Sequence, residues 1–171
     1  MPKKKLKQKA ERLIEQFLLE INQFSPKCVI LFGSYARGNF TEYSDIDVCV
    51  IAERLPENEL IRRTLVGFYN TPKIAAIGFY PQEFINFIKK RRCFVYDIIA
   101  DGIVVYNDGF FENIKSVYEG CIRKFQMIRE ANGWRWKKAN EDYSKVQDKT
   151  LSNVHEILDL SCNTQHVTRN T

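Results

Sequence analysis

The feature that most constrains the fold is a short polar break between two apolar runs. The first run, Cys28 to Phe32, ends at Gly33-Ser34, and the second run, Ile46 to Ala52, begins beside Asp45 and Asp47. Apolar runs of this length, bounded by turn residues, predict buried β-strands. Because residues two apart in a strand point to the same face, the two aspartates should project side by side from the start of the second strand.

Two neighbouring carboxylates repel each other unless a cation lies between them. Oxygen ligands of this kind, completed by water and phosphate oxygens, suit Mg²⁺. On the other side of the break, Gly33 lets the backbone approach a ligand closely. Ser34 is expected to cap a short helix whose first amides favour an anion. A metal on one side and phosphates on the other predict a site for a nucleoside triphosphate.

The string from Phe32 to Gly38 reads Phe-Gly-Ser-Tyr-Ala-Arg-Gly, and ten residues separate Ser34 from the Asp45-x-Asp47 pair. This pattern resembles the signature of the polymerase-β-type nucleotidyltransferase superfamily, and in particular the minimal nucleotidyltransferases of prokaryotes. The resemblance runs from about Leu6 to Trp134 and includes a Pro-x-Glu-Phe helix, a Gly-Ile-Val-Val-Tyr strand and a final helix ending in Gly-Trp. It implies an α/β (α+β) fold in which helices flank a small mixed sheet of about four strands, with a helical C-terminal extension.

The resemblance also implies an activity and a set of site residues. The activity is transfer of a nucleoside monophosphate from a triphosphate, expected to be ATP, to a hydroxyl of a small molecule or protein, with Mg²⁺ or Mn²⁺. In such proteins the paired aspartates hold the metal ions, a role that falls here to Asp45 and Asp47. Gly33 and Ser34 take the role of the corner that holds the terminal phosphates. Arg37 either contacts a phosphate or braces the aspartates, and both roles stay open.

The chain departs from the family pattern at one position. The family places a third carboxylate on the next strand, six residues before the proline of the Pro-x-Glu-Phe helix, and here that position is Ala75. The strand Lys73 to Tyr80 contains no acid at all. We therefore expect impaired catalysis, and the alternative is a non-catalytic nucleotide-binding or regulatory module that acts through a protein partner. The nearby acids considered as replacements are Glu42, Glu83, Asp97 and Asp101.

Hydrophobic periodicity predicts the remaining elements. These are helices at 6–24, from Pro56 to Tyr69, from Pro81 onward, at 94–100 and at 114–128, and strands at 73–80 and 103–106. Residues 1–136 are expected to form the nucleotidyltransferase domain including its closing helix. Residues 137–171 are expected to form a helical, partly disordered tail, because their apolar stripe is thin.

Composition limits the partners and the compartment. The five cysteines form no CxxC pair and predict reduced, buried thiols in a cytoplasmic protein. No stretch is apolar enough to span a membrane. The net charge of +5 is compatible with an anionic partner without requiring one. The basic run Lys3 to Lys7 is interpreted as a solvated helix start, with a nuclear address or a nucleic-acid arm as the less favoured alternatives. A separate helical protein partner of the toxin–antitoxin type and a homodimer both stay open.

Overall fold

The centre of the molecule is a four-stranded mixed sheet with the strand order β3-β2-β1-β4. The computed structural model describes residues 2–131 and 133–136, so the expected tail at 137–171 and the domain boundary before it are not tested. β1 runs antiparallel to both β2 and β4, whereas β2 and β3 are parallel. The strands are β1 (Pro26–Phe32), β2 (Ile46–Ala52), β3 (Ile74–Phe79) and β4 (Ile103–Asn107). The sheet and its flanking helices confirm the predicted fold class.

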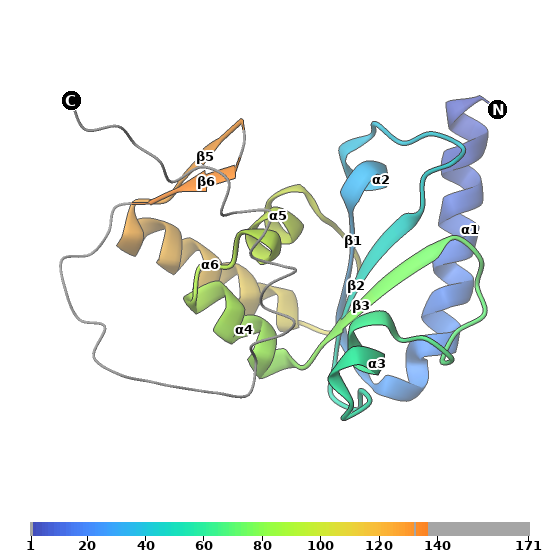
Figure 1. Ribbon diagram of the computed structural model, residues 1–171, viewed down its shortest axis with the longest axis horizontal. Coiled ribbons are helices and arrows are strands. Elements are labelled where there is room, and N and C mark those ends of the chain that lie inside the picture. Colours follow the sequence, from blue (N-terminus) through green and yellow to red (C-terminus); the bar gives the residue numbers. More distant parts are fainter. Residues whose placement is uncertain (1, 132, 137–171) are drawn as a thin grey trace.

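Helices cover both faces of this sheet (Figure 1). Residues alternate between the faces because side chains in a strand alternate. One face, with Val29, Leu31, Val48 and Val50, packs against α1 (Lys3–Ile21), which continues as the 3₁₀ turn η1 (Asn22–Phe24). The other face packs against a second group of helices and contains Cys28, Ile30, Cys49 and Ile51. This group consists of α4 (Pro81–Lys89), α5 (Cys93–Asp101) and α6 (Phe110–Phe125).

The cysteines of the described residues are buried and free, as predicted. They are Cys28, Cys49, Cys93 and Cys121, whereas Cys162 lies outside the described residues. Burial, followed by the nearby charges of Asp108 and Glu112, raises the pKa of Cys28 to about 12. The Cys28 thiol is therefore protonated at neutral pH and serves as a small apolar group in the core.

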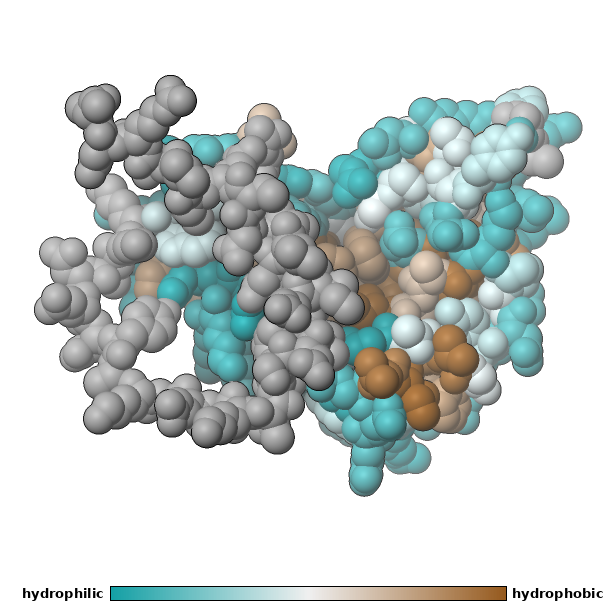
Figure 2. Space-filling model, viewed as in Figure 1, coloured by the Kyte–Doolittle hydropathy of each residue, from teal (hydrophilic) through white to brown (hydrophobic). Residues whose placement is uncertain are grey.

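The helix expected to run from Pro56 to Tyr69 is much shorter. α3 (Glu59–Thr64) begins after Asn58, whose side-chain oxygen accepts a hydrogen bond from the Ile61 amide, and ends at Leu65, which is left-handed with φ of 49°. α3 also buries two arginines and exposes an apolar side chain. Arg62 and Arg63 are only 8% and 9% exposed, whereas Leu60 is 70% exposed. Figure 2 shows the resulting apolar side chains at the surface where α3 lies.

The expected closing helix, extending to Ile128 and ending in Gly-Trp, is also wrong in its last part. α6 ends at Phe125 because Gln126 adopts a left-handed conformation with φ of 47°. A two-stranded hairpin follows, made of β5 (Ile128–Glu130) and β6 (Gly133–Arg135). In the part of the chain described here, no helix combines the length and the apolarity that crossing a bilayer requires.

Candidate functional site

The Gly-Ser corner and the second aspartate meet where β1 ends. The last residue of β1, Phe32, pairs directly with Asp47 of β2. Gly33 follows with φ of +68°, a conformation that residues with a side chain rarely adopt. A Cβ atom added to Gly33 would lie 2.0 Å from Asp47 Oδ2. The carboxylate of Asp47 therefore lies against the backbone of the corner and is not directed away from it.

The negative charge of Asp45 acts on the nearby carboxylate of Asp47. Asp45 is exposed and Asp47 is half-buried. Burial raises the pKa of Asp47, the negative charge of Asp45 raises it further, and the positive charge of Arg37 lowers it. A cation beside both carboxylates would offset the repulsion between Asp45 and Asp47, which is the second cause of the raised pKa of Asp47. Two oxygen-donor side chains of this kind fit a Mg²⁺ ion that takes its other ligands from water and from a substrate phosphate.

Ser34 and Arg37 both lie on the short helix that follows β1. Ser34 does not cap a helix, which corrects our expectation: α2 (Gly33–Arg37) already begins at Gly33, and no side chain caps it. The early start follows from the turn at Gly33, which brings Ser34 into the first turn of α2. Arg37, in the last turn of α2, is exposed, and its charge lowers the pKa of both Asp47 and Asp101.

Ala75 occupies the position next to Asp47 on the neighbouring strand. β2 and β3 pair in parallel register with Asp47 opposite Ala75, so their Cβ atoms point to the same face of the sheet. Ala75 is exposed although it lies within β3. The position from which the family's third carboxylate would project is therefore open and holds only a methyl group.

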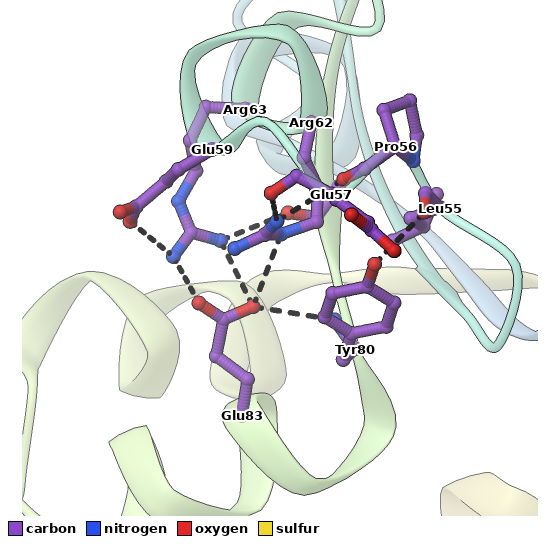
Figure 3. Close-up of polar contacts among 9 residues, drawn as sticks. Leu55, Pro56, Glu57, Glu59, Arg62, Arg63, Tyr80 and Glu83 are labelled. Atoms are coloured by element: carbon purple, nitrogen blue, oxygen red, sulfur yellow. Dashed lines mark hydrogen bonds and ion pairs between the residues drawn. The ribbon is translucent and has the colours of Figure 1, made fainter.

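Glu83, one of the acids considered as a replacement, is committed elsewhere. Its carboxylate bonds both Nη atoms of Arg63, lies 3.6 Å from Arg62 Nε, and accepts a hydrogen bond from the Tyr80 amide (Figure 3). Arg63 also donates to the Gly78 carbonyl oxygen at 2.9 Å. Because a buried guanidinium requires a counter-charge, Glu83 is needed to hold α3 against β3 and α4.

Asp97 and Asp101 on α5 also have partners. Asp101 forms a two-pronged ion pair with Arg129 of the hairpin, at 2.5 and 2.6 Å. Asp97 accepts a hydrogen bond from the Trp134 indole nitrogen at 2.9 Å. Both acids therefore attach the hairpin to α5. Within residues 2–131 and 133–136, no group of three or more potential metal ligands occurs, so no third acid joins Asp45 and Asp47 there.

Lys73 is a residue near the site that our sequence reasoning did not single out. Its side-chain Nζ donates a hydrogen bond to the carbonyl oxygen of Glu42. Its own carbonyl oxygen accepts a hydrogen bond from the Ile46 amide at 2.8 Å. Lys73 thus holds both ends of the segment that carries Asp45. No local sequence signal marks this role, because it depends on the parallel pairing of β2 with β3.

A family model and a similar protein both point to a nucleotidyltransferase. The family model described as "Nucleotidyltransferase domain" matches residues 11–106. The chain is similar to "Putative protein adenylyltransferase MJ1305" of Methanocaldococcus jannaschii, with 41% identity over 138 residues, which cover 70% of this chain and 92% of that protein.

Shorter and more remote similarities accompany this match. The chain is also similar to "Putative protein adenylyltransferase MJ0141" of the same organism, with 57% identity over 28 residues, which cover 16% of this chain and 28% of that protein. A solved structure titled "Crystal structure of the toxin-antitoxin with AMP-PNP" covers 66% of this chain and 86% of its own, at 15% identity and a TM-score of 0.42. A structural likeness this remote supports no conclusion about function.

Proposed function

The chain belongs to the nucleotidyltransferase domain family, and on that premise we propose that it transfers AMP from ATP to a hydroxyl group of an acceptor protein. The observation that carries this proposal is the contact between the Asp47 carboxylate and Gly33, beside a second acid, Asp45. The choice of ATP and of a protein acceptor follows the name of the relative that is 41% identical, a protein adenylyltransferase. The proposed catalytic unit is residues 1–136.

In this proposal each site residue has a defined role. Asp45 and Asp47 hold Mg²⁺, which when bound offsets negative charge on the triphosphate and the departing pyrophosphate. Gly33 and Ser34 form the corner that holds the terminal phosphates, and Arg37 contacts one of these phosphates. The acceptor oxygen bonds to the α-phosphorus while the bond from that phosphorus to the bridging oxygen breaks. Pyrophosphate leaves, and the hydroxyl proton passes to solvent.

The open position at Ala75 supports a second candidate function. Without a third acid among the described residues, the group that would help to activate the acceptor hydroxyl is missing. The chain would then bind ATP and regulate a protein partner through that binding, with little or no transfer. The two candidates share the same nucleotide site and differ only in whether pyrophosphate is released.

The experiment measures ATP binding by calorimetry with and without Mg²⁺, and then pyrophosphate release with candidate acceptor proteins. We expect Mg²⁺-dependent binding that is lost in Asp45→Asn. The control Glu15→Gln removes one negative charge from the exposed side of α1 and should bind ATP normally. Equal ATP affinity of Asp45→Asn and the unmodified protein would contradict the site. Binding without release for every acceptor would favour the regulatory candidate.

A further inference from the structure

The positive charge of the chain is concentrated in one short segment. Residues 1–12 carry six basic side chains and one acidic side chain, whereas residues 13–171 carry 20 of each sign. The whole net charge of +5 therefore comes from the start of α1. We call the six basic residues the lysine surface; they are Lys3, Lys4, Lys5, Lys7, Lys9 and Arg12.

All six side chains are exposed, while Leu6 and Ala10 anchor this part of α1 in the core. From Lys3 to Arg12 the helix rises roughly 14 Å. The ion pairs formed among the described residues all use other cations, so none of these six charges is neutralised by a neighbouring acid there. The lysine surface is thus free to meet a negatively charged partner.

Its position in the helix is unfavourable for the stability of α1. Cations near the first turn of a helix oppose the helix dipole, whereas acids there are favourable. The first turn of α1 contains Lys3, Lys4 and Lys5 and no acid, and no side chain caps the helix. These lysines form no ion pairs with the described acids, and their charges oppose the helix dipole. The stability of the fold therefore does not explain why they are present.

α1 begins at the end of the molecule where α2 lies (Figure 1). Lys3 Nζ lies 5.5 Å from the centre of the Phe40 ring. Phe40 in turn stacks on Tyr35 of α2, with ring centres 4.2 Å apart. These two contacts connect the lysine surface to α2, which begins at Gly33. A partner bound along the lysine surface would therefore lie beside the nucleotide site.

We propose that the lysine surface is a docking site for an acidic segment of the acceptor protein, an inference that rests on the proposed function. Charge complementarity between this segment and the lysines would raise the rate of encounter and align the acceptor hydroxyl. A protein fits better than a nucleic acid because five of the six cations are lysines, whereas arginine is the preferred residue for nucleic-acid phosphates. The nearest ring, Phe40, is also buried and already stacked, so it offers no platform for a base.

The test uses the full chain and a random copolymer of glutamate and tyrosine, which supplies both acidic side chains and acceptor hydroxyls. We expect the copolymer to bind, and the triple variant Lys4→Gln/Lys5→Gln/Lys7→Gln to bind it about tenfold more weakly at low salt. The control Lys115→Gln/Arg123→Gln/Lys124→Gln removes three exposed charges from α6 and should bind the copolymer normally. Raising the salt from about 50 to about 300 mM should remove most of the difference.

Single-stranded RNA is tested as the alternative ligand, because the ring of Tyr43 is exposed and a base can stack on it. Tighter binding of RNA than of the copolymer, with a loss in both the triple lysine variant and Tyr43→Ala, would overturn the proposal. Equal copolymer affinity of the triple variant and the unmodified protein would also overturn it. ATP affinity is measured separately on each variant. If the unmodified protein does not bind ATP, the proposed function is wrong. If it binds ATP but the lysine variant binds the copolymer as well as the unmodified protein does, only the docking site is wrong.

Discussion

The carboxylate of Asp47 fills the space that a side chain on Gly33 would need, at the end of β1. The Asp47 Oδ2 atom lies where a side chain on residue 33 would begin, 2.0 Å from the position of an added Cβ atom. The glycine and the carboxylate therefore depend on each other. The turn can keep its φ of +68° without a side chain, and the missing side chain leaves room for the acid.

Gly33→Ala should reduce ATP affinity by about tenfold or more, since the new methyl group displaces the Asp47 carboxylate. It should also destabilise the fold by about 1–3 kcal/mol because of the left-handed backbone. Calorimetric ATP titration and chemical unfolding measure the two effects. The matched control is Gly38→Ala, since Gly38 has φ of +75° but no atom within 4 Å of an added Cβ. An equal loss of ATP affinity in both variants would show that the contact with Asp47 is irrelevant.

Ala75→Asp should raise the rate of pyrophosphate release by about tenfold to a hundredfold, because it restores a carboxylate next to Asp47. Residue 75 is exposed, so the larger side chain should fit without loss of stability. Single-turnover assays with ATP and an acceptor protein measure the rate. Ala75→Asn is the control, since it adds a side chain of similar size without the charge. An identical rate in the Asp and Asn variants would refute the role assigned to this position.

Glu83→Gln should destabilise the protein by about 3 kcal/mol, because it leaves the buried guanidinium of Arg63 without its counter-charge. ATP affinity should stay the same, since Glu83 bonds arginines and not the candidate site. Denaturant unfolding and ATP titration separate the two effects. The control Glu59→Gln removes the other carboxylate on Arg63, which is more exposed, and should cost less than about 1 kcal/mol. Normal stability with lost ATP binding would place Glu83 in the nucleotide site.

The pair formed by Asp101 and Arg129 predicts a pH dependence of stability. The hydrogen bonds from Arg129 lower the pKa of Asp101 below its usual value of 3.8. A carboxyl group with a lowered pKa in the folded state stabilises the fold at pH values above 3.8, and this contribution is lost as the pH falls through the lower value. The difference in melting temperature between the protein and Asp101→Asn should therefore be constant near neutral pH and shrink in acid. A difference that grows in acid would contradict the assigned ion pair.

The sequence alone determined the strands around the corner and the place of Asp47 within the second of these strands. The predicted span of β2, Ile46 to Ala52, agrees with the structure residue for residue. These features are local: an apolar run, a glycine turn and the two-residue period of a strand are all readable over a few residues. The family resemblance has its signature in the same short segment, and the match of the family model to residues 11–106 confirms the family. The roles given to these residues stay predictions.

Only the tertiary structure decided which way α3 faces, where the chain turns back after α6, and which acids have other partners. Leu60 is 70% exposed, whereas Arg62 and Arg63 are buried. Glu83, 20 residues beyond Arg63, supplies the counter-charge of these two arginines. The neighbours Asp47 and Ala75 likewise meet only because β2 and β3 pair in one parallel register. Such contacts join residues that are far apart in the chain, so their energies leave no local pattern in the sequence.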